Sequence, residues 1–147
     1  MMIRRPDASG TFFTAARYRN RAMYALACLI AVLFGLASRR YPDVLPAFLG
    51  KYPGDTLWAV MVFFGWGLLR RRDSTSRVTL LALTTCLTVE VLKLYRAPWM
   101  IDIRHTMLGH LVFGHAFSAQ NLVAYAVGVA VALGVEIAWP YAGQGVG

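Results

Sequence analysis

Four long apolar segments, separated by short polar segments rich in arginine, dominate the chain. They cover about residues 22–38, 55–70, 78–95 and 122–139. A helix rises about 1.5 Å per residue, so such segments can cross a hydrocarbon core of about 30 Å when flanking arginines reach toward the interface. The pattern predicts an all-α fold, a polytopic transmembrane helical bundle of about four spans.

A fifth apolar stretch separates the third span from the fourth. No Asp, Glu, Lys or Arg occurs between Arg104 and Glu136, and this interval is too long for one span. The polar run Ser118-Ala-Gln-Asn121 divides it, while Pro98 disfavours a continuation of the third span. We therefore expect an additional short helix over about residues 101–117. Interfacial, re-entrant and spanning placements of this helix remain open.

The composition leaves no room for a separate soluble domain. Of the 147 residues, 58% are hydrophobic and 15% are charged, whereas roughly 25% of the residues in a soluble domain are charged. We expect a basic cytoplasmic N-terminal arm over residues 1–21 and one membrane domain over residues 22–139. The glycine-rich tail over residues 140–147 is expected to be flexible.

The net charge of +8 comes from basic residues that cluster between the apolar segments. This is the positive-inside pattern of a membrane protein, not a nucleic-acid surface. With the N-terminus inside, nine Lys and Arg residues fall on the inner side and six on the outer side, so both termini are expected in the cytoplasm. Four of the seven acids fall on the outer side, which predicts a paired polar network there.

Two charged residues lie inside the third apolar segment. Glu90 and Lys93 are three residues apart, so they can lie on one face of a helix and pair. Charge within a bilayer is costly, and such residues usually face a protein interior or a watery cavity. Two interpretations remain open: a polar site that opens outward, or an internal salt bridge that holds helices together.

Further candidate residues fall at the same predicted level of the membrane. Asp55 opens the second span as a helix cap or as a functional acid, and Asp102 suits a local ion pair near a helix start. Arg104 can bind a carboxylate or a phosphate with its forked guanidinium group. Asn121 could cap the last span or face the cluster together with Tyr125. The candidate polar cluster is Asp55, Trp58, Glu90, Lys93, Arg96, Asp102, Arg104, Asn121 and Tyr125.

The histidines do not predict a metal site. His105, His110 and His115 repeat every five residues, so neighbours on one helix would point about 140° apart. Gly109 and Gly114 lack the preceding strand and the lysine of a phosphate-binding loop. No recognisable nucleophile–base motif occurs. We therefore expect no metal, no cofactor and no catalytic residue, and we favour a non-enzymatic protein.

Five segments stand in a characteristic order and spacing: Gly35–Arg39, Tyr52–Ala59, Glu90–Trp99, Ile103–Gly109 and Leu122–Gly128. Together they resemble a family of small bacterial integral membrane proteins known as domain of unknown function 2809. The resemblance covers about residues 20–138 and implies a location in the bacterial inner membrane.

The chain departs from that family pattern at two positions. Lys93 stands where glutamine is expected, and Asn121 stands where aspartate is expected. Both changes would weaken a cation site and strengthen an anion site. The later half, with a helix glutamate followed by an arginine and a helix start containing Asp and Asn, is also distantly similar to VanZ-like membrane proteins. That similarity implies a role at the cell envelope.

The leading functional hypothesis is an envelope protein that binds an anionic lipid or lipid-linked head group through Arg96, Arg104 and Lys93. Glu90 and Asp102 would hold these bases in place. The alternative is a small oligomeric transporter or channel with Glu90 along its pathway, and a membrane hydrolase ranks last. The expected partners are membrane lipids. A homo-oligomer or a membrane protein partner remains open, and no nucleic acid is expected.

Overall fold

The computed structural model describes residues 18–44, 46, 52–114 and 116–138. Across these residues the chain forms α-helices and one short 3-10 helix, and no strand occurs in them. The all-α prediction is therefore confirmed. Most of the predicted N-terminal arm, residues 1–17, and the predicted tail lie outside the described residues.

Four long helices correspond to the four apolar segments. They are α2 (Arg21–Arg40), α3 (Tyr52–Leu69), α4 (Thr75–Leu92) and α7 (Ala119–Ala138), and the 3-10 helix η1 (Pro42–Val44) follows α2. Of these, α2, α4 and α7 are long and apolar enough to cross a membrane. Three such helices indicate a membrane protein.

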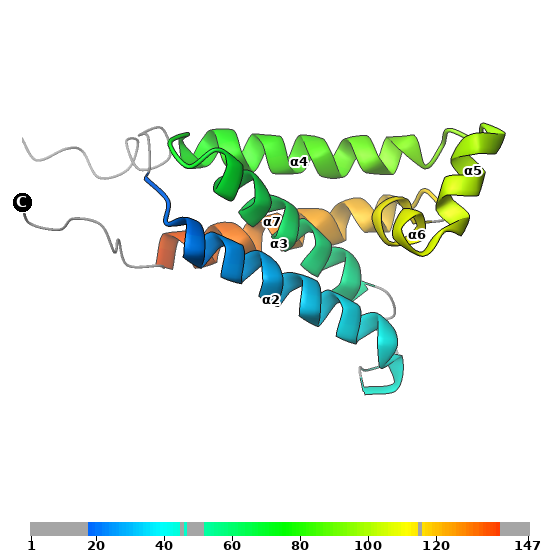
Figure 1. Cartoon of the computed structure of the whole chain (residues 1–147), viewed down its shortest axis with the longest axis horizontal. Coiled ribbons are helices and arrows are strands. Elements are labelled where there is room, and N and C mark those ends of the chain that lie inside the picture. Colours follow the sequence, from blue (N-terminus) through cyan, green and yellow to red (C-terminus); the bar gives the residue numbers. More distant parts are fainter. Residues whose placement is uncertain (1–17, 45, 47–51, 115, 139–147) are drawn as a thin grey trace, which may run out of the picture.

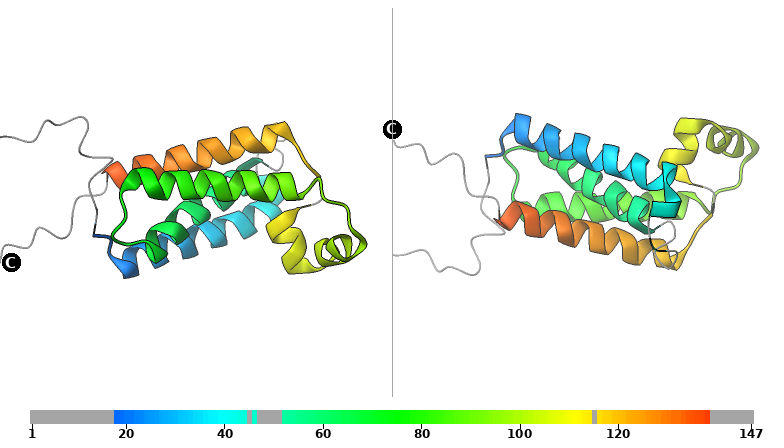
Figure 2. Two further views of the ribbon diagram at one scale, coloured as in Figure 1. Left: turned by 90° about the horizontal axis from the view of Figure 1, so that it is seen from above. Right: turned by 90° about the horizontal axis from the view of Figure 1, so that it is seen from below.

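Helix α3 lies at the centre of the bundle and packs against α2, α4 and α7 (Figure 1, Figure 2). The polar start of α3, Tyr52-Pro-Gly-Asp55, lowers its mean hydropathy, and it is not among the three membrane-crossing candidates. Its buried residues recur along its whole length, whereas α2 buries Ala31 alone. Helix α3 therefore faces protein, and α2 exposes most of its surface.

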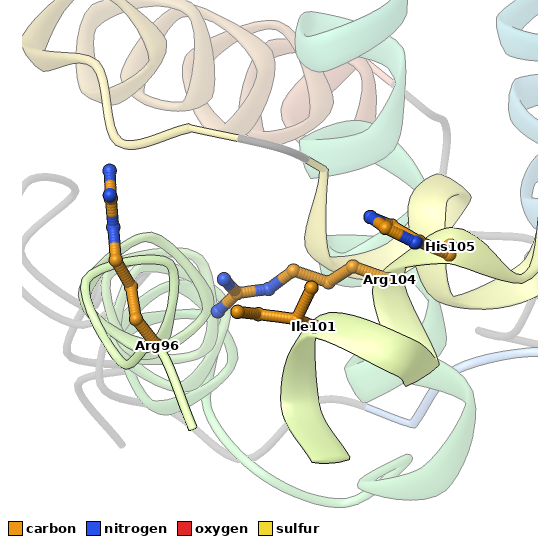
Figure 3. A pocket seen from close by; sticks show the side chains of 4 residues that line it. All are labelled: Arg96, Ile101, Arg104 and His105. Atoms are coloured by element: carbon orange, nitrogen blue, oxygen red, sulfur yellow. The ribbon is translucent and has the colours of Figure 1, made fainter. Parts of the chain in front are cut away.

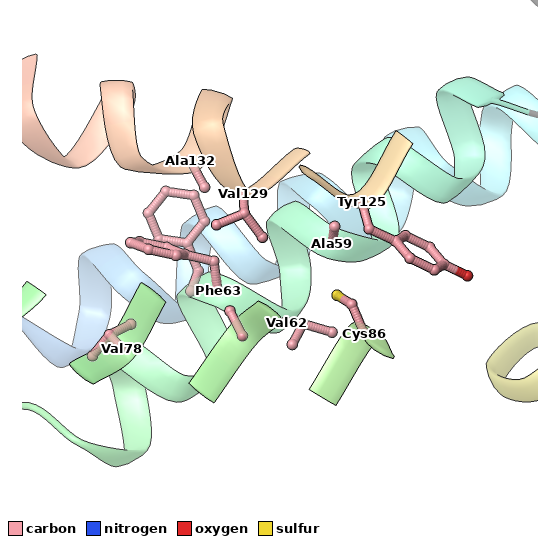
Figure 4. Close-up of a cluster of buried hydrophobic side chains, with 10 residues drawn as sticks. Ala59, Val62, Phe63, Val78, Cys86, Tyr125, Val129 and Ala132 are labelled. Carbon is pink, nitrogen blue, oxygen red and sulfur yellow. The ribbon is translucent and has the colours of Figure 1, made fainter. Parts of the chain in front are cut away.

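An apolar core fills the space between α3, α4 and α7 (Figure 4). Gly128 permits the close approach of α7 to α3, because a Cβ atom at this position would lie 2.3 Å from the carbonyl oxygen of Thr56. It would also lie 2.8 Å from the Cβ atom of Ala59. The core residues are Ala59, Val62, Phe63, Phe64, Val78, Ala82, Cys86, Tyr125, Val129 and Ala132.

The single short helix predicted over residues 101–117 is wrong. The chain instead forms α5 (Pro98–His105) and α6 (Met107–Phe113), which meet at a corner. The hydroxyl oxygen of Thr106 caps α6 by accepting a 3.0 Å hydrogen bond from the backbone N–H of Gly109. A Cβ atom at Gly109 would lie 1.7 Å from the carbonyl oxygen of Ile103, so the corner requires glycine.

Helices α5 and α6 project beyond one end of the bundle (Figure 1, Figure 2). We call this the α5 end; it is where α2 and α4 end and where α3 and α7 begin. The opposite end, which holds the turn between α3 and α4, is called the turn end. The residues of the predicted polar cluster all lie toward the α5 end, on the first turns of α3 and α7, the last turn of α4, the link after it and α5.

Candidate functional site

A buried hydrogen-bond network surrounds Glu90 in the last turn of α4, where the residue is 0% exposed. Its Oε2 atom accepts from Lys93 Nζ at 2.5 Å and from the hydroxyl of Tyr125 at 3.0 Å. Its Oε1 atom accepts from the backbone N–H of Ser118 at 2.8 Å and from Asn121 Nδ2 at 3.2 Å. The pairing expected from the three-residue spacing is confirmed, and four donors satisfy the carboxylate.

Lys93 closes this network at the C-terminal end of α4. The residue is 6% exposed, and its ammonium group also donates to the hydroxyl oxygen of Tyr125 at 3.2 Å. The chain passes close over it at Gly114, where a Cβ atom would lie 3.4 Å from Lys93 Cε. The Glu90–Lys93 pair is therefore enclosed, and its geometry favours the internal salt bridge over a site that opens outward.

Asn121 and Tyr125 come from the start of α7. The interpretation of Asn121 as a helix cap is wrong, because α7 begins at Ala119 and Asn121 lies buried inside its first turn. Its side-chain amide instead reaches across to Glu90. Trp58 of α3 packs against Tyr125, with 5.7 Å between the ring centroids. These residues join α3, α4 and α7 around one carboxylate.

Asp55 lies in the first turn of α3, not at its cap, because the helix begins at Tyr52. A carboxylate in that turn interacts favourably with the positive end of the helix dipole. Asp55 Oδ1 also lies 3.4 Å from Arg39 Nη2, and this pair connects α3 to the end of α2. The Arg39 side chain is 35% exposed, so the pair contributes little to stability.

Two arginines line a pocket at the α5 end (Figure 3). Arg96, in the link between α4 and α5, is exposed, whereas Arg104 of α5 is 5% exposed. Ile101 and His105 complete the lining, and the volume is about 160 Å³. Arg104 Nη2 donates to the carbonyl oxygen of Leu92 at 2.5 Å, while its buried Nε has no hydrogen-bond partner in the described part of the chain.

The local ion pair expected for Asp102 does not form with Arg104, the base two residues further along α5. Residues two apart on a helix do not face each other, and Asp102 is exposed on α5 whereas Arg104 is buried. Of the three bases that Glu90 and Asp102 were expected to hold in place, Lys93 is bound by Glu90 as expected. Arg104 is held by a backbone carbonyl instead, and neither Arg96 nor Arg104 pairs with an acid among the described residues.

A second buried ion pair lies at the turn end, where the sequence interpretation missed it. Arg19 Nε donates to Glu136 Oε1 at 2.8 Å, and both side chains are 1% exposed. The hydroxyl of Tyr24 donates to the same oxygen at 2.8 Å. Arg19 Nη1 also donates to the carbonyl oxygen of Asp73 at 2.6 Å. Arg19, which belongs to the N-terminal arm predicted over residues 1–21, therefore binds the α3–α4 turn.

The two described histidines belong to different helices. His105 belongs to α5 and His110 to α6, while His115 lies outside the part of the chain that the structure describes. In that part, no group of three or more His, Cys, Asp and Glu side chains could hold a metal ion. The candidate site is thus a cationic pocket beside a closed salt bridge.

Comparison with solved structures finds no match for the chain. A family model described as "Protein of unknown function (DUF2809)" matches residues 44–129, which is more than half of the chain. The match includes the Glu90 network and the arginine pocket, whereas Arg19 and Glu136 lie outside it. The chain therefore belongs to this family of proteins of unknown function.

Proposed function

We propose that this protein binds an anionic lipid or lipid-linked head group at the α5 end, as a four-span protein of the bacterial inner membrane. Helix α3 is the fourth span. It packs against α2, α4 and α7, so it does not need the hydropathy of a lipid-facing helix. The proposal includes a role in maintenance of the cell envelope, which a distant resemblance of the later half to VanZ-like proteins would imply.

The distribution of charge supports an orientation with the α5 end outside. Arginines crowd the turn end, where Arg21 begins α2, Arg70, Arg71 and Arg72 follow α3, and Arg77 lies in the first turn of α4. Short segments rich in arginine favour the cytoplasmic side. Arg19 and Glu136, close to the first and last described residues, lie at the turn end, so in this orientation both termini are cytoplasmic.

The observation that supports the proposal most strongly is the state of Arg104. Its side chain is buried, and it has no acidic partner within the described residues. A buried charge without a counter-charge is costly, so such residues in membrane proteins commonly mark functional sites. Arg96 adds a second positive charge to the same pocket, and none of the described residues that line it is an acid. An anionic ligand would compensate both charges.

The surface around this pocket suits the membrane interface. Tyr95 and Trp99 are 51% and 57% exposed, and Met107 and Leu108 of α6 are 83% and 72% exposed. Tyrosine and tryptophan favour the head-group level of a bilayer, where amphipathic segments bury their apolar side chains. This placement would bring the pocket to the depth of lipid phosphates.

Transport along Glu90 finds less support. The carboxylate is fully buried and satisfied by four donors. Between Glu90 and the turn end, the helices α3, α4 and α7 pack closely around the apolar core, which extends from Cys86 and Tyr125 to Val78 and Ala132. A route past Glu90 would have to separate these helices.

Native mass spectrometry with added phosphatidylglycerol and phosphatidylcholine tests the proposal. The wild-type protein should retain phosphatidylglycerol preferentially. Arg96→Gln should reduce this retention about tenfold or more, because a hydrogen bond to a charged group contributes about 1.5–3 kcal/mol. Arg40→Gln, at an exposed arginine in the last turn of α2, is the matched control and should retain the lipid. Equal retention of both lipids by the wild type, Arg96→Gln and Arg104→Lys would refute the proposal.

A further inference from the structure

We infer that the pocket formed by Arg96, Ile101, Arg104 and His105 selects a lipid whose head group is a phosphate monoester. The inference rests on the proposed function and names the ligand class for the same pocket. A phosphate monoester has one oxygen bound to the lipid and three free oxygens. A phosphate diester, the group in most membrane phospholipids, has two free oxygens.

The size of the pocket suits a small group. Its volume is about 160 Å³. A phosphate group has five heavy atoms, so it is small enough to enter this pocket. Pockets for drug-sized ligands are larger, at about 300–1,000 Å³. The sugar or polyol of a larger head group would have to lie outside.

The charge of the pocket matches a dianion better than a monoanion. Arg96 and Arg104 are two permanent positive charges, and His105 adds a ring nitrogen. A phosphate monoester carries a charge of about −1.5 to −2 near neutral pH and offers three strong acceptor oxygens. A diester carries one negative charge and would leave one arginine uncompensated.

The hydrogen-bonding groups of Arg104 favour the same ligand. One N–H of Nη2 is held by the carbonyl oxygen of Leu92, while the Nε–H has no partner in the described chain. Nε itself is buried, so the N–H groups of Nη1 and the second N–H of Nη2 are the ones left to bind phosphate oxygens. Arg104 reaches from α5 toward Arg96 (Figure 3). A third free oxygen, which a diester lacks, is then available to Arg96.

The apolar side of the pocket fits the lipid end of such a ligand. Ile101 lines the pocket and is 37% exposed. Its side chain offers an apolar surface for the first carbon atoms beyond the single ester oxygen. Free phosphate would gain nothing from this contact, so a lipid source is favoured over soluble phosphate.

Competition in native mass spectrometry tests the inference. Phosphatidic acid and phosphatidylglycerol with identical acyl chains are added together to the full-length protein. The wild type should retain phosphatidic acid about tenfold better, which corresponds to about 1.4 kcal/mol. Arg96→Gln should abolish this preference, because it removes the group that would bind the third oxygen. Arg40→Gln should preserve it.

The outcomes separate this inference from the proposed function. If the wild type retains both lipids equally and Arg96→Gln loses both, selection of a phosphate monoester is overturned, whereas binding of an anionic lipid is supported. Retention of neither lipid would overturn both. Inorganic phosphate should displace phosphatidic acid only when the phosphate is in large excess. Displacement at equal concentrations would overturn the inference that the ligand is a lipid.

Discussion

Replacement of Glu90 by glutamine would leave the ammonium group of Lys93 without its counter-charge in a buried position. The Lys93 side chain is 5% exposed and the Glu90 side chain is 0% exposed, so water cannot replace the lost carboxylate. Removal of one partner of a buried ion pair costs about 3–5 kcal/mol. We expect Glu90→Gln to lower the free energy of unfolding by this amount.

The reciprocal change should cost less, and the structure explains why. In Lys93→Met the orphaned carboxylate still accepts from the N–H of Ser118, the amide of Asn121 and the hydroxyl of Tyr125. The main loss is one hydrogen bond between charged groups, which contributes about 1.5–3 kcal/mol. The double variant Glu90→Gln/Lys93→Met removes both charges, so it should cost less than Glu90→Gln alone.

Unfolding of each variant in mixed micelles of a mild detergent and dodecyl sulfate, followed by tryptophan fluorescence, measures these differences. Arg39→Gln is the control, because its partly exposed pair with Asp55 should contribute only about 0–1 kcal/mol. An unfolding free energy for Glu90→Gln within about 1 kcal/mol of wild type would refute the reasoning. A double variant whose cost equals the sum of the two single costs would refute the coupling.

Four further substitutions, one of them a control, test a helix contact, the buried Arg19–Glu136 pair and backbone strain. Gly128→Val should destabilise the protein by at least about 1–3 kcal/mol in the same assay, because the valine side chain would meet the backbone of α3. Its control is Gly134→Ala, which has open space around it and should be neutral or stabilising by about 0.5–1 kcal/mol. Equal effects of the two substitutions would contradict the close contact at Gly128. Arg19→Gln should cost about 3–5 kcal/mol, because it leaves Glu136 charged and buried, and an unchanged unfolding curve would exclude a stabilising role for this pair. Gly114→Ala should cost about 1–3 kcal/mol, because its backbone angles of φ 60° and ψ −168° suit glycine, and a wild-type midpoint would contradict that strain.

The sequence predicts the long helices well, because their hydrophobic pattern is a local property. The segment expected over residues 22–38 is α2 (Arg21–Arg40), and the segment expected over residues 78–95 is α4 (Thr75–Leu92). The Glu90–Lys93 pair follows from a three-residue spacing on one helix, which is also local. Features of this kind need no knowledge of how the helices pack.

The remaining features depend on contacts between distant segments or on backbone geometry. Arg19 and Glu136 are separated by 117 positions, so no local spacing indicates the pair. The sequence does contain one indication of this buried pair, because Glu136, like Glu90, is an acid at the end of an apolar segment. Asn121 was misassigned because asparagine suits a helix cap and also donates from its amide. The corner at Thr106 depends on a close backbone contact that the hydrophobic pattern does not report.

The pocket, too, could be identified only from the three-dimensional structure. Arg96 and Arg104 were both candidates in the sequence, and the link between α4 and α5 brings them to one pocket. Lys93, the third candidate base, is three residues before Arg96 but is bound by Glu90 instead. Lys93 therefore joins a closed salt bridge, whereas Arg96 and Arg104 line a pocket without a counter-charge from the described residues. This difference depends on how the helices pack.

A crystal structure from a lipidic mesophase containing phosphatidic acid would test the central claim most directly. The account predicts density for a phosphate group within hydrogen-bonding distance of the guanidinium groups of both Arg96 and Arg104, with Arg104 still bound to the carbonyl oxygen of Leu92. A pocket without a bound anion, with Arg96 or Arg104 paired instead to an acid of the protein such as Asp102, would contradict it.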